Sequence, residues 1–192
     1  MNSNPQDLKS LILNTNEPLI FKDVWNSKML EWNLDKWREV LKDKELVFRS
    51  GVFEATNEPQ WERKTESKKG SFEYFMEQTS SNSNWLYFDY KYLAEWFTDL
   101  ADLRENISWA LFGFPEKTAD DSTIWIGSKG AHTPCHVDTY GFNLIHQVFG
   151  RKLWIIAPPD ENLKPTRIPY EESSVYSRLN FFSPSDQEFK GR

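Results

Sequence analysis

Apolar residues recur at helical spacing in four segments of the first half of the chain. In each segment they fall three or four positions apart, which places them on one face of a helix. The expected amphipathic helices cover residues 5–13, 34–42, 72–79 and 90–105. Asn33 and Ser71 directly precede two of them. Short polar side chains of this kind cap helices, because they accept hydrogen bonds from the free amides of the first turn.

Short apolar runs bounded by turn residues predict strands, and these become more closely spaced after residue 122. The expected strands cover residues 19–21, 45–49, 85–88, 123–127, 141–149 and 152–156, with at most one more within 175–182. Residues 54–70 are rich in Glu, Lys, Thr, Asn and Pro. Such a composition buries little apolar surface, so we expect an exposed loop there. The pattern indicates an α+β or mainly β fold, with helices first and strands later.

Composition narrows the class of protein. The chain has 192 residues, of which 39% are hydrophobic and 16% aromatic, enough for the core of one domain. Its net charge of -6 argues against a nucleic-acid partner, because binding to a phosphate backbone needs clustered Lys and Arg. The polar N-terminus carries no long apolar run, so we expect no signal peptide and no membrane span. A single cysteine, Cys135, fits a reducing compartment, and we expect a cytoplasmic protein.

The most informative stretch holds all three histidines. His136 and Asp138 are two positions apart, and in extended backbone such residues project from the same face, while Cys135 and Val137 point the other way. An imidazole and a carboxylate on one face can reach one cation together. They would form two thirds of the 2-His-1-carboxylate triad that holds non-haem Fe(II) and leaves positions open for dioxygen and a co-substrate.

An H-x-D triplet alone is common by chance, but its surroundings are specific. Thr133 and Pro134 precede it, and an N-x-x-x-Q-x-x-G-x-K pattern from Asn143 to Lys152 leads into an apolar run that stops at Pro158 and Pro159. This block resembles the JmjC family of Fe(II)/2-oxoglutarate oxygenases, in particular its small hydroxylase-type branch. The resemblance implies a double-stranded β-helix, which is a cupin-like jelly roll. Residues 1–122 would form its N-terminal extension and residues 123–192 the first half of the barrel.

The resemblance also implies roles for individual residues. It assigns Fe(II) to His136 and Asp138, and 2-oxoglutarate to Lys152, Thr133 and Tyr87, with Asn143 as a polar group near the metal. Lys152 would pair with the distal carboxylate of the co-substrate, and the hydroxyls would hydrogen-bond it. Other interpretations stay open: Lys152 as a solvated turn lysine, and Thr133 as an ordinary residue before proline.

The other two histidines have no role under the resemblance. His146 falls out of phase with Asn143, Ile145 and Gln147, so it should face the opposite side from them. We expect His132 and His146 to be surface or satisfied core histidines.

The family's third ligand, a histidine on a late barrel strand, has no counterpart, because no histidine follows His146. We therefore expect an incomplete barrel, a chain truncated before that ligand, and weakened binding of Fe(II) and 2-oxoglutarate. Two functions remain. One is a protein hydroxylase or demethylase. The other, implied by resemblance to one member of the family, is a non-catalytic interaction protein that binds a small heat-shock protein and acts in the cellular stress response.

Overall fold

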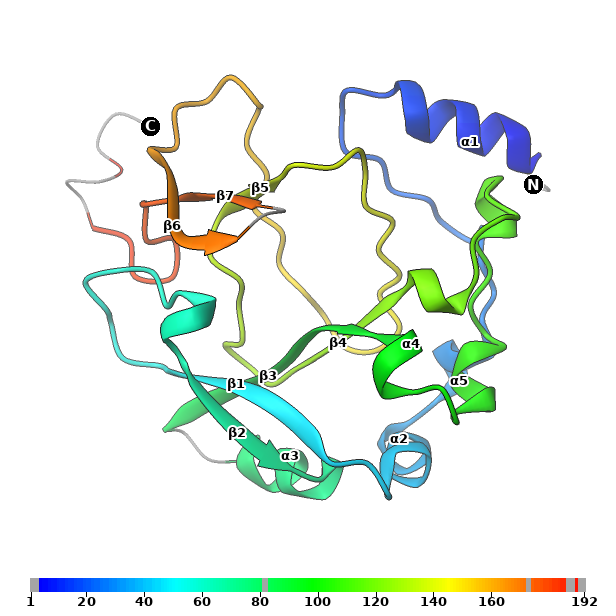
Figure 1. Cartoon of the computed structure of the whole chain (residues 1–192), viewed down its shortest axis with the longest axis horizontal. Coiled ribbons are helices and arrows are strands. Elements are labelled where there is room, and N and C mark those ends of the chain that lie inside the picture. The colour runs from blue at the N-terminus through cyan, green and yellow to red at the C-terminus, as the bar shows by residue number, and fades with distance from the viewer. Residues whose placement is uncertain (1–3, 81–82, 172–173, 186–188, 190–192) are drawn as a thin grey trace. The chain divides into compact units, whose positions relative to one another are not determined.

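The computed structural model describes residues 4–80, 83–171, 174–185 and 189 (Figure 1). Its α-helices are α1 (Pro5–Asn14), α2 (Leu34–Leu41), α3 (Phe72–Gln78), α4 (Leu93–Trp96) and α5 (Ala101–Arg104). Short 3-10 helices are η1 (Lys28–Glu31), η2 (Glu62–Lys64), η3 (Ala110–Phe112) and η4 (Ala119–Asp121). The strands are β1 (Leu46–Val52), β2 (Glu66–Gly70), β3 (Asn84–Tyr92), β4 (Thr123–Gly127), β5 (His136–Asp138), β6 (Pro165–Glu171) and β7 (Ser174–Ser177).

Four strands form one sheet in the order β2-β1-β3-β4, and three form another in the order β5-β7-β6. All pairings between β1 and its neighbours, and all pairings of β7, are antiparallel. The described residues form no closed barrel. The fold is therefore mixed α+β with antiparallel sheets.

The chain forms two compact units that are interleaved along the sequence. The first unit comprises residues 1–43, 90–125 and 142–152, and the second comprises residues 44–89, 126–141 and 153–192. Each unit thus depends on segments that are far apart in the chain.

The first unit has its core around α1. Leu8 and Ile12 lie one helical turn apart and pack with Phe112 and Phe114, which come from a segment a hundred residues later. The helix begins because the Asn4 side chain accepts a hydrogen bond from the Gln6 amide at 3.0 Å. No helix among the described residues is long and apolar enough to cross a membrane.

The second unit is organised around β1, which pairs with β2 on one side and β3 on the other. Phe48 on β1 stacks on Phe75 of α3 at 5.3 Å between ring centroids and meets Phe88 of β3 at 6.1 Å. The α3 helix therefore covers one face of this part of the sheet. Arg49 occupies the opposite face, because successive strand residues alternate.

Most of the expected elements are confirmed. Helices form at 5–14, 34–41 and 72–78, with Asn33 and Ser71 as caps that accept bonds from Lys36 and Tyr74. The strands expected at 45–49, 85–88 and 123–127 are present, and one short strand lies in the 175–182 region.

The single helix expected over 90–105 is wrong. β3 continues to Tyr92, and two four-residue helices follow. Phe97 ends α4 with φ -136° and ψ 39°, outside the helical region. The apolar spacing was informative about burial, since Leu93, Phe97 and Leu103 are buried, but not about backbone continuity.

Two expectations for polar and short apolar segments are also wrong. Part of the loop expected at 54–70 is β2, which pairs with β1 from Leu46 opposite Gly70 to Ser50 opposite Glu66. An edge strand needs only backbone pairing on one side, so its side chains can be polar. The strand expected at 19–21 does not form, and Ile20 is 86% exposed.

The strands expected at 141–149 and 152–156 do not form either. In the first segment the side-chain alternation is nevertheless present: Phe142, Leu144 and His146 are half-buried, and the residues between them are exposed. In the second segment Leu153 is 85% exposed. No strand among the described residues pairs with either segment, and a strand without a hydrogen-bonded neighbour does not persist. β6 was not expected, because prolines suppress strand predictions although edge strands accept them.

Candidate metal and co-substrate site

His136 and Asp138 lie together on one face of β5. Nε2 of His136 is 3.4 Å from Oδ1 of Asp138. β5 pairs with β7, which places Tyr176 opposite His136 and Ser174 opposite Asp138. The expectation that extended backbone brings the imidazole and the carboxylate to the same face is confirmed.

The imidazole of His136 is held in one tautomer. Its Nδ1 donates a hydrogen bond to the Pro134 carbonyl at 2.9 Å, which leaves Nε2 as the nitrogen directed toward Asp138. A hydrogen bond of this kind orients a histidine whose other nitrogen binds a metal. Ser174 Oγ donates to Asp138 Oδ1 at 3.4 Å and steadies the carboxylate.

Electrostatics around the pair come from three further residues. The hydrogen bond that Nε2 of the protonated ring donates to Asp138 is the main reason why the pKa of His136 is raised, although burial works against it. The Tyr176 ring lies 5.7 Å from the His136 ring, and its hydroxyl donates to Glu62 at 3.0 Å. Burial raises the pKa of Glu62, while the nearby Arg49 charge lowers it.

Tyr87 and Thr133 lie together in the same unit. Burial raises the pKa of Tyr87 to about 12, the Asp89 charge raises it further, and the Thr133 hydroxyl acts in the opposite direction. Thr133 Oγ1 is itself buried and has no hydrogen-bond partner of acceptable geometry among the described residues. Gly127 contacts the Tyr87 ring, because a Cβ there would lie 3.1 Å from it. The structure thus brings two hydroxyls assigned to the co-substrate side by side.

The remaining two expected site residues belong to the other unit. Asn143 and Lys152 are exposed, and Lys152 Nζ lies 5.3 Å from the centre of the Trp125 ring. Their roles toward the metal and the co-substrate stay predictions.

The other histidines have aromatic partners. His132 stacks on Phe182 at 4.2 Å, and His146 stacks on Trp25 at 4.2 Å. Burial lowers the pKa of both imidazoles. The prediction that His146 faces away from Asn143 is confirmed, since it packs inward and Asn143 is exposed. Neither ring is fully satisfied, because His132 Nε2 and His146 Nδ1 are buried without a partner in the described structure.

Sequence reasoning missed the buried charges of this unit. Arg49 Nε and Asp89 Oδ2 form an ion pair at 2.8 Å, and their side chains are 7% and 12% exposed. The position of Arg49 could have indicated its burial. It lies between Phe48 and Ser50 in β1, and both faces of this strand are covered, so a charged side chain there is buried on either face. Within the described part of the chain, no three His, Cys, Asp or Glu residues come close enough to hold a metal.

Comparison with known proteins assigns the sequence to a family. The family described as "Cupin-like domain" matches residues 5–191. The chain belongs to the cupin-like domain family. This confirms the expected relation to JmjC-type proteins and the expected fold class.

The cupin-like domain is similar to HSPB1-associated protein 1 from several animals. It is 39% identical to the Homo sapiens protein over 201 residues, covering 96% of this chain and 41% of that protein. For the Rattus norvegicus protein the identity is 38% over 203 residues, with 96% and 42% covered. For the HSPB1-associated protein 1 homolog of Danio rerio it is 33% over 202 residues, with 96% and 45% covered. The chain thus spans about two fifths of the length of these relatives. No solved structure matches it with significance.

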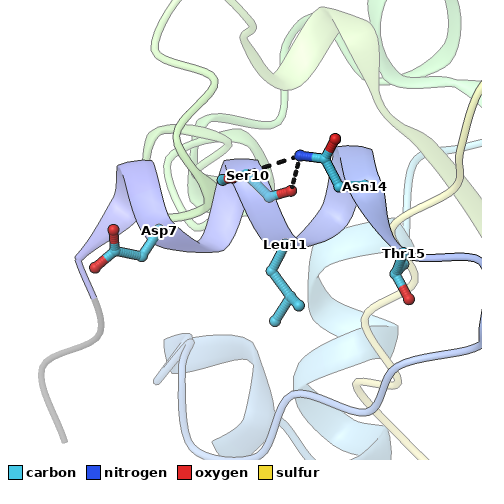
Figure 2. A pocket seen from close by; sticks show the side chains of 5 residues that line it. All are labelled: Asp7, Ser10, Leu11, Asn14 and Thr15. Atoms are coloured by element: carbon cyan, nitrogen blue, oxygen red, sulfur yellow. Dashed lines mark hydrogen bonds between the residues drawn. The ribbon is translucent and has the colours of Figure 1, made fainter.

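Two surface hollows of the cupin-like domain lie apart from these site residues. One, of about 420 Å³, runs along α1 and is lined by Asp7, Ser10, Leu11, Asn14 and Thr15 (Figure 2). Figure 2 shows the Asn14 amide turned back to Ser10, where Nδ2 donates to the backbone oxygen at 2.6 Å. The other, of about 510 Å³, lies between β1 and residues 56–66. Neither contains a histidine, so neither competes with β5 as the candidate metal site.

Proposed function

We propose that this cupin-like domain carries the metal-binding face of a JmjC-type Fe(II)/2-oxoglutarate-dependent protein hydroxylase or demethylase. The observation that supports this most directly is the pair on β5, where Nε2 of an oriented His136 lies 3.4 Å from the Asp138 carboxylate. The bond to the Pro134 carbonyl is of the kind that orients the ring of a metal-binding histidine.

In this proposal His136 and Asp138 supply two of the three protein ligands. Bound Fe(II) would supply the redox chemistry with dioxygen, and the chain's own residues would orient the reactants. Tyr87 and Thr133 would donate hydrogen bonds to 2-oxoglutarate, Lys152 would neutralise its distal carboxylate, and Asn143 would line the metal site. Buried hydroxyls are rarely left without partners, so the orphaned Thr133 Oγ1 fits a group that awaits an acceptor.

An anaerobic titration of the chain with Fe(II) and 2-oxoglutarate tests the proposal. Chelation of iron by the keto acid gives a visible charge-transfer band, and we expect this band in the wild type and not in His136→Ala. His146→Ala is the matched control, because the His146 ring packs on Trp25 and has no assigned role toward the metal or the co-substrate, so the band should be unchanged. A folded wild-type protein without any band would overturn the proposal for this chain.

A second candidate function is non-catalytic binding of a small heat-shock protein in the cytoplasm, as part of the cellular stress response. The relatives are named for association with HSPB1. The supporting observation is an exposed apolar run in the second unit, where Leu153, Ile155 and Ile156 are all more than half exposed. Contiguous exposed apolar patches are a mark of protein interaction sites.

A binding assay of purified HSPB1 on the immobilised chain distinguishes the two functions. Under the interaction proposal, His136→Ala and Asp138→Ala bind HSPB1 as the wild type does, whereas Leu153→Lys with Ile155→Lys loses binding. Loss of binding in both ligand variants, with the fold intact, would count against an interaction that is independent of the metal site.

A further inference from the structure

Arg49 is a buried charge of the second unit with several partners, and the proposed chemistry does not use it. It lies directly opposite Tyr87 in the pairing of β1 with β3. Its guanidinium carbon lies 5.1 Å from the Trp85 ring and 5.7 Å from the Tyr87 ring, and Nε pairs with Asp89. Trp85, Tyr87 and Asp89 are alternate residues of one strand, so Arg49 contacts a continuous face of β3.

The same guanidinium reaches two backbone carbonyls outside the sheet. Nη2 donates to the His132 oxygen at 2.7 Å, and Nη1 donates more weakly to the Gln60 oxygen at 3.4 Å. The His132 carbonyl belongs to the peptide bond that leads into Thr133. One planar group therefore links the strand that carries Tyr87 to the segment that carries Thr133.

The charges nearby argue against a direct role in binding an anion. Arg49 is already paired with Asp89 at 2.8 Å, and it also acts on the carboxyl of Glu62. A buried cation that already interacts with two carboxylates, here those of Asp89 and Glu62, has little capacity to neutralise a third carboxylate. The guanidinium instead fixes the positions of its partners. Its planar group donates N–H bonds to three acceptors in fixed directions, which a lysine ammonium cannot do.

We propose that Arg49 is a positioning residue for 2-oxoglutarate: it fixes the Thr133 hydroxyl beside the Tyr87 hydroxyl, so that both can donate to the co-substrate. This inference rests on the proposed function of the site. It assigns to Arg49 no contact with the metal or the co-substrate.

The test measures two affinities in the full chain, those for Fe(II) and for 2-oxoglutarate at saturating Fe(II), without dioxygen. Arg49→Lys keeps the charge and loses the fork, and Arg49→Met loses both. For both variants we expect the dissociation constant for 2-oxoglutarate to rise at least tenfold, because loss of a residue that orients a ligand-binding side chain typically costs about 10–100-fold. We expect the affinity for Fe(II) to change less than about twofold. Full affinity in Arg49→Lys would mean that charge alone matters and would overturn the proposal. Parallel loss of both affinities would do the same, since it would indicate a general structural role.

Arg104→Lys is the matched control. Arg104 also bridges an aspartate and a backbone carbonyl, with bonds to Asp120 at 2.7 Å and to the Leu93 oxygen at 3.4 Å, but contacts none of the candidate site residues. We expect its 2-oxoglutarate affinity to be that of the wild type.

Hydrogen exchange of the backbone amides keeps the proposal testable if a variant is unstable or if the wild type fails to bind 2-oxoglutarate. Arg49→Lys and the milder Asp89→Asn should exchange several-fold faster at residues 131–135, with α2 unchanged. Unchanged exchange at 131–135 would overturn the tethering role. A wild type that binds no 2-oxoglutarate would overturn the proposed function, and the exchange result would still decide whether Arg49 tethers the segment.

Discussion

His132 and Phe182 stack with their ring centroids 4.2 Å apart and their planes only 9° apart. The imidazole is also edge-on to Trp85, and its Nδ1 donates to the Gly130 carbonyl at 3.0 Å. Burial lowers the pKa of His132, and the Arg49 guanidinium lowers it further. The folded chain therefore favours the neutral ring.

The stability of the chain should consequently fall in mild acid. The unfolded state takes up the proton of His132 near the ordinary pKa of 6.5, before the folded state does. The contribution of this ring is therefore complete above that pH and is lost as the pH falls below it. Urea unfolding between pH 7.5 and 5 should show a smaller acid loss in His132→Phe than in the wild type. An equal loss would show that the ring is not held neutral. His136 acts in the opposite direction but is common to both proteins.

Replacing Thr133 with valine should separate stability from co-substrate binding. Thr133→Val removes a buried hydroxyl that has no partner of acceptable geometry among the described residues, and such groups cost about 1–3 kcal/mol when unsatisfied. We expect the free energy of unfolding to stay constant or rise, and the affinity for 2-oxoglutarate to fall. Thr133→Ser, which keeps the hydroxyl, should retain the affinity. If Thr133→Val instead lowers the free energy of unfolding by about 1–3 kcal/mol, the hydroxyl has a hydrogen-bond partner in solution.

The bond from Tyr176 to Glu62 should contribute to stability. Tyr176→Phe removes the hydroxyl 3.0 Å from a largely buried carboxylate, and we expect a loss of about 1–3 kcal/mol in urea unfolding. Tyr92→Phe is the control, because it removes an exposed hydroxyl bonded to Tyr90 and should cost less than about 0.5 kcal/mol. An equal loss of stability in Tyr176→Phe and Tyr92→Phe would show that the Glu62 carboxylate is solvated.

Gly51 is required by close packing rather than by backbone conformation. A Cβ at this position would overlap the Trp85 ring and the Gln60 side-chain oxygen, so Gly51→Ala should lose about 1–3 kcal/mol by overpacking. Gly141→Ala is the control, since nothing lies within 4 Å of a Cβ there. Thermal unfolding of the two variants measures the difference. Similar midpoints would show that Trp85 moves aside at little cost.

Local signals predicted the local features of this molecule well. Caps such as Asn33 and Ser71 and the phase of His136 and Asp138 depend only on neighbours in sequence, and all are present. The prediction that His146 faces away from Asn143, Ile145 and Gln147 is also confirmed, although the segment is not a strand. Strand formation failed there because it depends on a partner, and a sequence pattern does not say whether the partner is present.

The parts that could not be predicted depend on distant residues. β2 is polar and forms because β1 lies beside it. The contact of Arg49 with the His132 carbonyl joins residues 83 positions apart, and no local pattern marks it. For the candidate site, the spacing predicted that His136 and Asp138 lie on one face, whereas the setting around Tyr87 and Thr133 became visible only in three dimensions.

The interleaving of the two units has a consequence during synthesis on the ribosome. α1 is translated before its core partners, because Phe112 and Phe142 follow Ile12 by 100 and 130 residues. At about 5–20 residues per second, the amphipathic helix waits for several seconds or more with Leu8 and Ile12 uncovered. A nascent chain of this kind is a candidate client for the chaperones that meet polypeptides at the exit tunnel.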